Sequence, residues 1–185
     1  MIKVRSKQHS IELIEQLRLN SMPQAVLSKE NEESIVNFFE KNPAKEYVIR
    51  DIFTPMGKYK FVETLDECLE YVNGLSANKF SISVSFRPIK NRILLGDIMV
   101  SNNFVTLSAS KSETANHRNI YDSPEISLNC DLYDDRLWDV PGFEKLIEYI
   151  NKYNLFDIVV EFAIFKNKAG KKKDNVVIIE LRSDY

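Results

Sequence analysis

The chain has 185 residues, of which 44% are hydrophobic and 28% charged, and its formal net charge is −2 at pH 7. This composition is typical of a globular protein and excludes a disordered chain, a collagen-like repeat and a coiled coil, and the near-neutral charge provides no overall basic field for nucleic acid or an anionic membrane. No apolar run approaches the roughly 18–20 residues of a membrane span, and the first residues lack a signal-peptide pattern, so the cytoplasm is the expected location.

In the N-terminal part, helical and strand patterns alternate along the chain. Thr64 is followed three residues later by Glu67, which is the pattern of a capping box at the start of a helix. The acidic first turns of segment 28–41, and the proline that follows it, indicate a second helix. The predicted elements are a helix from Ser10, a helix over 28–41, strands over 47–50 and 59–62, and a helix from Thr64.

The C-terminal part is mainly predicted as strands. Residues 80–86 alternate with period two, so that one face is apolar and the other carries serines. Residues 111–139 are polar and predict an irregular segment. The other predicted elements are strands over 92–100, 104–108, 157–165 and 176–182, and a helix opened by Pro141 and Gly142.

The order of these elements predicts the fold class. Helices interleaved with antiparallel strand pairs are typical of an α+β fold and not of a doubly wound parallel sheet. The length suits a single domain over 1–185, or two lobes that share it, a small α+β lobe over 1–79 and an antiparallel sheet lobe over 80–185.

Each of the last two predicted strands contains one glutamate in an apolar run, Glu161 and Glu180. An ionised carboxylate inside a buried strand costs several kcal/mol unless something compensates its charge. If the strands pair as a hairpin around Gly170, the two glutamates lie opposite each other, about 5 Å apart, and repel. A divalent cation between them reverses that repulsion, and oxygen ligands suit Mg²⁺ or Mn²⁺.

Other arrangements of these glutamates stay open from the sequence. Arg182 lies on the same face as Glu180 and pairs with one carboxylate in the simplest alternative, while the other reaches solvent. A register slip of one residue would place the two glutamates on opposite faces. Asp97 is a third acid in an apolar run, which either joins the glutamate pair or caps a bulge at Gly96.

Taken in chain order, the elements and three short segments resemble the ATP-grasp fold. The segments are Met22–Val26 ahead of the helix over 28–41, the strand that ends at Arg50 with the glycine-containing loop and return strand over 56–62, and the closing strands that carry Glu161 and Glu180. The resemblance implies two antiparallel sheets with interleaved helices, and a protein that binds ATP and Mg²⁺ between two lobes.

The resemblance also assigns roles to individual residues. Arg50 and Lys60 are expected to bind the cofactor's phosphates, and Glu161 and Glu180 are expected to hold Mg²⁺ on them. Family members activate a carboxylate as an acyl phosphate, so the implied function is an ATP-dependent ligase.

Two arginines are the candidate catalytic residues, Arg118 and Arg182, because positive side chains stabilise charge on the transferred phosphoryl group. Arg118 lies in a polar segment that reads either as a lid or as a surface loop. The sequence departs from the family at Arg182, where a metal-binding asparagine is usual, since a guanidinium cannot coordinate a cation. Arg50 likewise stands where a lysine is usual, and its alternative role is an ion pair with Asp51 or with another acid.

The main alternative function is a catalytically inactive α+β protein-interaction module. In that case Arg182 and a neighbouring base neutralise Glu161 and Glu180. The expected partner is otherwise a nucleotide, and a protein partner or a homodimer is compatible with the sequence. No membrane contact is expected, and the overall charge argues against nucleic acid even though lysines cluster over 166–173.

Overall fold

The computed structural model describes residues 2–53, 58–87, 89–112, 120, 122–166 and 175–183. The chain divides into two compact units, one formed by Met1–Ser21 with Lys90–Tyr185 and the other by Met22–Ile89. This division differs from the lobe boundary expected at residue 80, because the strand Lys79–Val84 pairs inside the second unit. The N-terminal helix, in turn, packs on the last strand of the first unit.

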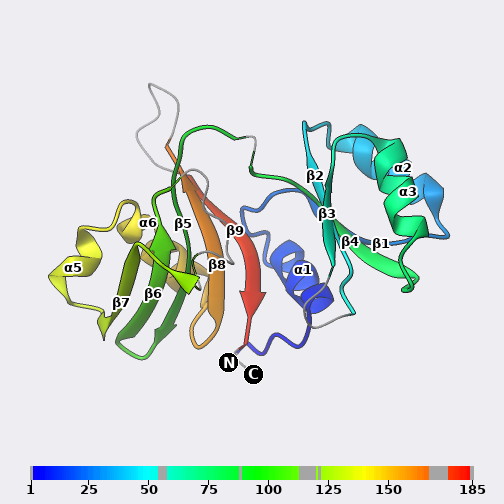
Figure 1. Cartoon of the computed structure of the whole chain (residues 1–185). Helices are drawn as coiled ribbons and strands as arrows, with labels where there is room; N and C mark the ends of the chain where they lie inside the picture. Colours follow the sequence, from blue (N-terminus) through cyan, green and yellow to red (C-terminus); the bar gives the residue numbers. More distant parts are fainter. Residues whose placement is uncertain are drawn as a thin grey trace. The chain divides into compact units, whose positions relative to one another are not determined.

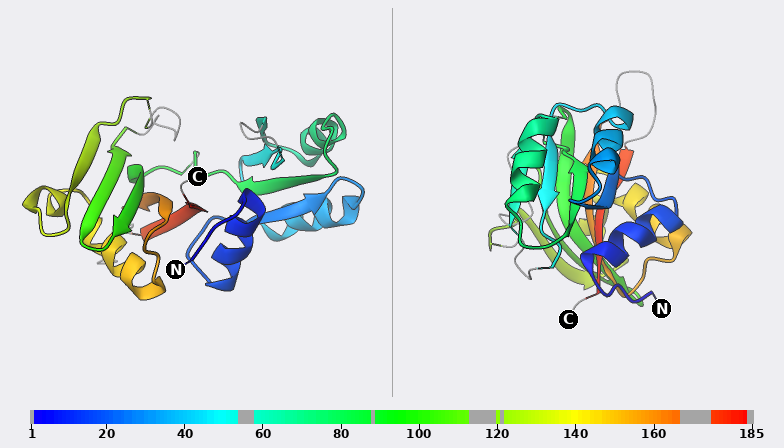
Figure 2. Two further views of the ribbon diagram at one scale, coloured as in Figure 1. Left: turned by 90° about the horizontal axis from the view of Figure 1, so that it is seen from below. Right: turned by 90° about the vertical axis from the view of Figure 1, so that its right-hand side faces the viewer.

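The second unit is a four-stranded antiparallel sheet with two helices on one face (Figure 1). The strand order is β1-β4-β2-β3. Figure 2 shows the two helices on the same side of this sheet. The elements are β1 (Gln24–Ser28), α2 (Glu32–Lys41), β2 (Tyr47–Arg50), β3 (Tyr59–Val62), α3 (Leu65–Asn73) and β4 (Lys79–Val84).

The apolar periodicity of these segments explains the packing of the second unit. Ile49 and Ile82 face the helices and are fully buried with Ile35 of α2 and Cys68 of α3. Burial raises the pKa of the Cys68 thiol to about 12, so this cysteine is an inert core residue. The serines of β4 lie on the opposite face, which confirms the alternation expected over 80–86.

Capping side chains set the helix limits in the second unit. Thr64 Oγ1 accepts a hydrogen bond from the backbone N–H of Glu67, which confirms the predicted cap of α3. Helix α2 begins later than expected, because Asn31 caps it through the N–H of Ser34. Residues 24–28 form β1 instead. This edge strand is half-buried at every position, so it lacks the alternation that identifies a strand.

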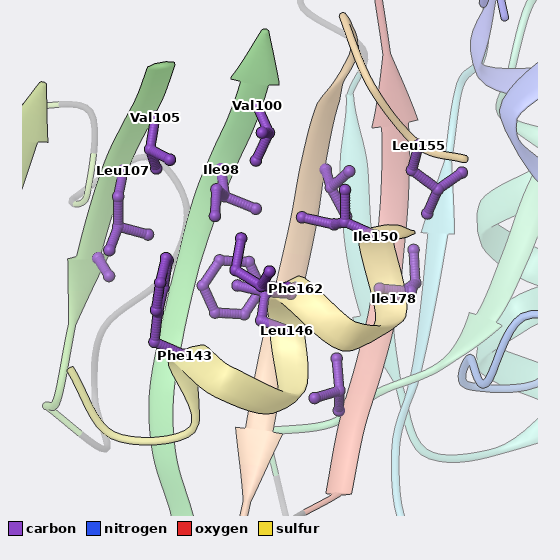
Figure 3. Packing of buried hydrophobic residues seen from close by; sticks show 14 of the residues in the cluster. Ile98, Val100, Val105, Leu107, Phe143, Leu146, Ile150, Leu155, Phe162 and Ile178 are labelled. Atoms are coloured by element: carbon purple, nitrogen blue, oxygen red, sulfur yellow. The ribbon is translucent and has the colours of Figure 1, made fainter. Parts of the chain in front are cut away.

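The first unit is a five-stranded antiparallel sheet in the order β7-β6-β5-β8-β9. Helix α6 packs its apolar side against one face of the sheet, with Phe143, Leu146 and Ile150 directed at Phe162 and its neighbours (Figure 3). Each such buried side chain contributes about 1.5–3 kcal/mol. The elements are α1 (Lys7–Gln16), β5 (Arg92–Ser101), β6 (Phe104–Ser110), β7 (Ile126–Asp131), α5 (Asp135–Trp138), α6 (Phe143–Tyr153), β8 (Val159–Phe165) and β9 (Asn175–Arg182).

Two parts of the first unit differ from the sequence-based expectation. The polar segment 111–139 contains β7 and α5, because Ile126, Leu128 and Cys130 anchor an edge strand whose alternate residues face solvent. Helix α1 begins at Lys7 and not at Ser10, since Ser6 caps it through the N–H of His9. None of the helices in the described residues has the length and apolar character that a membrane crossing requires.

Candidate functional site

Three carboxylates lie side by side on the five-stranded sheet, on the face opposite α6. Asp97 of β5 pairs with Glu161 of β8, and Glu161 pairs with Glu180 of β9. Directly opposed residues of antiparallel strands project to the same face. Neighbouring residues such as Val160 and Phe162 project into the core with α6. We call Asp97, Glu161 and Glu180 the acidic row.

A β-bulge places the two glutamates on one face. The predicted pairing of Glu161 with Glu180 is confirmed, but the next pair is Phe162 with Ile178, so Ile179 is an extra residue in β9. In a regular strand Glu180 and Ile178 would share a face. The extra residue allows Ile178 to enter the core while Glu180 joins the acidic row.

Two cations neutralise most of the charge of the acidic row. Arg182 Nε lies 3.1 Å from Glu161 Oε1, and Arg182 Nη2 lies 3.6 Å from Asp97 Oδ2. Lys7 of α1 forms an ion pair with Glu180. Asp97 and Glu161 are each only 7% exposed, so these pairs lie in a partly desolvated environment. Arg182 therefore pairs with a glutamate, as one alternative predicts, but the expectation that the other glutamate reaches solvent is wrong, because Glu180 is paired with Lys7 and its side chain is only 13% exposed.

The donor set of the acidic row, as arranged, does not fit Mg²⁺. This ion takes oxygen ligands in a near-octahedral shell, whereas Glu161 and Glu180 each direct an oxygen to a cationic side chain. Across the described residues, no group of three or more His, Cys, Asp or Glu side chains is placed to hold a metal ion. Arg182 supplies a fixed positive charge where an oxygen ligand was expected.

Sequence reasoning found most of this cluster but missed Lys7. Asp97, Glu161 and Glu180 stand out as acids in apolar strands, and Arg182 follows from the strand alternation. Lys7 is an ordinary lysine near the start of a helix, 173 residues from Glu180. Only the packing of α1 on β9 brings the two together.

In the four-stranded sheet, the two expected phosphate-binding residues lie on opposite faces. Lys60 pairs with Ile49, whose side chain is in the core under the helices, so Lys60 projects toward α3. Its Nζ lies 5.7 Å from the centre of the Tyr71 ring. Arg50 pairs with Tyr59 and projects to the other face. The structure therefore does not bring Arg50 and Lys60 together across this sheet.

Asp51 also lies on the helix side. Burial, and after it the charge of Asp51, raises the pKa of Tyr71 in α3. The Asp51 carboxylate accepts a hydrogen bond of 2.9 Å from the N–H of Phe53. Arg50 and the buried carboxylate next to it in the sequence are thus directed to different sides of the sheet.

The face that holds Arg50 also carries aromatic side chains, and we call Val48, Arg50, Tyr59 and Phe61 the aromatic face. The rings of Tyr59 and Phe61 meet edge to face at 5.6 Å. The guanidinium of Arg87 lies 4.0 Å from the centre of the Phe61 ring. Tyr59 is 59% exposed, so this face presents ring surface to solvent.

Arg87 is held at the end of the aromatic face by an acid and a hydroxyl. Its Nε lies 3.7 Å from Glu46 Oε1, which also accepts a hydrogen bond of 2.6 Å from Ser85 Oγ. Phe61, Arg87 and Glu46 were not predicted as site residues. Phe61 could have been found from the strand alternation, because it follows Lys60 and so projects to the other face of the strand. Glu46 and Arg87 lie outside any periodic pattern.

Several predicted features lie outside the described residues. Arg118, the second candidate catalytic cation, is one of them, and the loop residues Met56 and Gly57 are others. The lysines over 167–173 also belong to this group. Arg182, in contrast, is described and is part of the acidic row.

Comparisons with solved structures identify the fold. The D-alanine-D-alanine ligase from Coxiella burnetii is similar with a TM-score of 0.55 at 10% identity, over 97% of this chain and 48% of that chain. N5-Carboxyaminoimidazole synthetase from Staphylococcus aureus complexed with ADP gives 0.55 at 12% identity, over 98% and 45%. A RimK domain protein ATP-grasp from Sphaerobacter thermophilus gives 0.53 at 11% identity, over 96% and 58%.

These similarities confirm the predicted ATP-grasp-like α+β fold. The chain spans about half the length of the similar structures, from 45% to 58% of the three named. No family model matches the sequence, and no curated protein matches it either. With identities of 10–12%, the likeness concerns the fold alone.

Proposed function

We propose that the chain binds an adenine nucleotide, with the base on the aromatic face and a phosphate held by Arg50. The observation that carries this proposal is the juxtaposition of the Phe61 ring, the Tyr59 ring and the Arg87 guanidinium on one face of β3. Nucleobases stack on aromatic rings and guanidinium planes, and such stacking contributes about 1–3 kcal/mol per base. The similar synthetase with bound ADP supports the same ligand class.

Arg50 is suited to the phosphate part of this ligand. It extends from the end of β2 on the aromatic face, next to Tyr59 and Ser81 on the neighbouring strands. A guanidinium donates two parallel hydrogen bonds to phosphate oxygens. Lys60 is not included, because it projects to the helix side of the sheet.

We further propose, as the finer activity, an ATP-dependent ligase that activates a carboxylate. The similar structures include a D-alanine-D-alanine ligase, and the shared fold supports this reaction class. In such a reaction Arg50 would bind and orient a phosphate, and the rings of the aromatic face would orient the base and exclude water from it. The metal that ligases of this type employ would supply charge stabilisation at the phosphates, but the acidic row as arranged does not fit it.

The second candidate is an ATP-grasp-like protein without ligase activity. It is favoured by the ion pairs of Arg182 with Glu161 and of Lys7 with Glu180, which neutralise the two glutamates internally. This is the arrangement that the inactive alternative requires. It would bind a nucleotide or a protein partner and release no ADP.

A nucleotide panel tests the binding proposal. Thermal unfolding of the whole chain is followed with ATP, ADP and GTP, each with Mg²⁺ and with EDTA. Ligand at about 100 times its Kd stabilises the folded state by about 2.7 kcal/mol, so a rise in Tm with ATP and ADP is expected. The absence of any rise at millimolar nucleotide, confirmed by calorimetric titration, would contradict the proposal.

An activity assay separates the two candidates. ADP release is measured with ATP and mixtures of carboxylate and amine acceptors. A ligase releases ADP only when an acceptor is present, whereas the inactive candidate shows a rise in Tm with no ADP above the background of an Arg50→Ala variant.

A further inference from the structure

The acidic row contacts cationic side chains of the chain itself. Three carboxylates face two cations, and each cation is within 4 Å of at least one carboxylate oxygen. The Arg182 side chain is 23% exposed, and the carboxylates of Asp97 and Glu161 are less so. A divalent cation added here would lie close to the guanidinium and would be repelled by it.

Lys7 is positioned by several contacts of the N-terminal segment. The hydroxyl of Ser10, one turn further along α1, accepts a hydrogen bond of 2.8 Å from the backbone N–H of Leu181. The N–H of Val4 donates to Ser183 Oγ at 2.8 Å. These contacts lie on both sides of Lys7 along the chain, at Val4 and Ser10, so the N-terminal segment holds Lys7 against β9, the strand that carries Glu180.

We infer that Arg182 and Lys7 take the place of a divalent cation at the acidic row, so that the chain binds its nucleotide without Mg²⁺. The first half of this inference concerns the acidic row alone, and the second half rests on the proposed nucleotide function. The bulge at Ile179 aligns Glu180 with Glu161, and the two cations then provide the charge that this alignment requires.

A Mn²⁺ titration without nucleotide tests the first half. Binding is followed by electron paramagnetic resonance for the wild type, Arg182→Asn, Lys7→Ala and the double variant. Arg136→Asn is the matched control, because Arg136 is an exposed arginine paired with Asp134 in the same unit. We expect no binding to the wild type or the control at submillimolar Mn²⁺, and an affinity gain of about tenfold or more in the double variant.

The outcomes separate the two halves. Mn²⁺ binding to the wild type that is lost in Glu161→Gln overturns the inference, and so does a double variant that folds, by circular dichroism, but gains no affinity. If Arg182→Asn does not fold, the test depends on Lys7→Ala alone, and the inference then requires that this variant binds Mn²⁺ more tightly than the wild type.

The second half is tested by the ATP affinity of the wild type with Mg²⁺ and with EDTA. A change of less than about twofold is expected, and a larger loss in EDTA overturns the second half. An absence of ATP binding in both conditions, together with the expected Mn²⁺ pattern, would contradict the proposed function and leave the charge substitution in place.

Discussion

In the four-stranded sheet, the face away from α2 and α3 carries rings and a guanidinium, and Tyr59 there is 59% exposed. In the five-stranded sheet, the face away from α6 carries three carboxylates that are paired with Arg182 and Lys7. Both sheets bury one face under helices, and both place polar groups on the second face. The difference is in exposure, because Tyr59 and Arg87 present surface to solvent although they also contact their neighbours, whereas Asp97 and Glu161 are buried.

This comparison separates a binding surface from a structural charge cluster. A ring or cation that is exposed retains its capacity to bind a ligand. A buried carboxylate that is already paired is strongly destabilising when its partner is removed, because it is left charged and desolvated. Substitutions in the acidic row are therefore expected to lower mainly the stability of the fold, and substitutions on the aromatic face mainly the affinity for a ligand.

The largest effect is expected from Arg182→Met. Methionine keeps much of the length of the side chain but leaves Asp97 and Glu161, each 7% exposed, without this cation. Breaking a buried pair in this way costs about 3–5 kcal/mol. Urea unfolding of the whole chain measures the loss.

Two comparisons check the Arg182→Met result. Arg136→Met removes an arginine whose side chain is 66% exposed, and it is expected to change stability far less. Adding Glu161→Gln to Arg182→Met should restore part of the loss, since a neutral amide no longer needs the cation. Equal small effects of both methionine variants would show that the acidic row is not a desolvated cluster.

A smaller effect is expected from Phe61→Ala, and it should appear in ligand affinity. Loss of the ring removes a stacking surface of about 1–3 kcal/mol for a nucleobase. Calorimetric titration with ATP measures the change. Lys60→Ala is the matched control, because Lys60 is the neighbouring residue on the opposite face of β3, and it should leave affinity nearly unchanged. A loss of affinity in Lys60→Ala and none in Phe61→Ala would contradict the proposed surface and indicate binding on the helix side of the sheet.

The smallest effect is expected at the ion pair of Asp134 with Arg136, which is exposed, whereas most of the acidic row is buried. Side-chain hydrogen bonds from Arg136, and then its backbone N–H, lower the pKa of Asp134 from 3.8 to about 2. The stabilisation is therefore complete above pH 3.8 and is lost as the pH falls toward about 2. An NMR titration of the carboxyl should find this lowered pKa, and in Arg136→Ala a higher pKa that stays below 3.8, because the backbone N–H at position 136 still donates to Asp134. An identical pKa in both proteins would contradict the assigned cause.

Residues with local or periodic signals were predicted well. The strands β2 and β3 have the predicted limits, the cap of α3 is Thr64, and Glu161 lies opposite Glu180. These features depend on neighbours in the chain or on a two-residue repeat. The edge strand β1 was missed because all five of its residues are half-buried and no repeat is visible.

The chemistry of the candidate site was less predictable. Lys60 and Arg50 look equivalent in the sequence, but the pairing of β2 with β3 directs them to opposite faces. Ser10 looks like a helix cap in the sequence, yet its hydroxyl accepts a hydrogen bond from the backbone N–H of Leu181 in β9. Each of these outcomes depends on which face a helix covers or on a residue far away in the chain.

The amino-acid order is sufficient for the α+β class, the ATP-grasp-like succession of elements and the presence of acids in the closing strands, because spacing and hydrophobic periodicity carry that information. The state of those acids depends on long-range packing. The bulge in β9 places two glutamates that would repel each other on one face, and the packing of α1 and the position of Arg182 give each of them a cationic partner. Charges interact through space with whatever the fold brings near, and distance along the chain does not encode that neighbourhood.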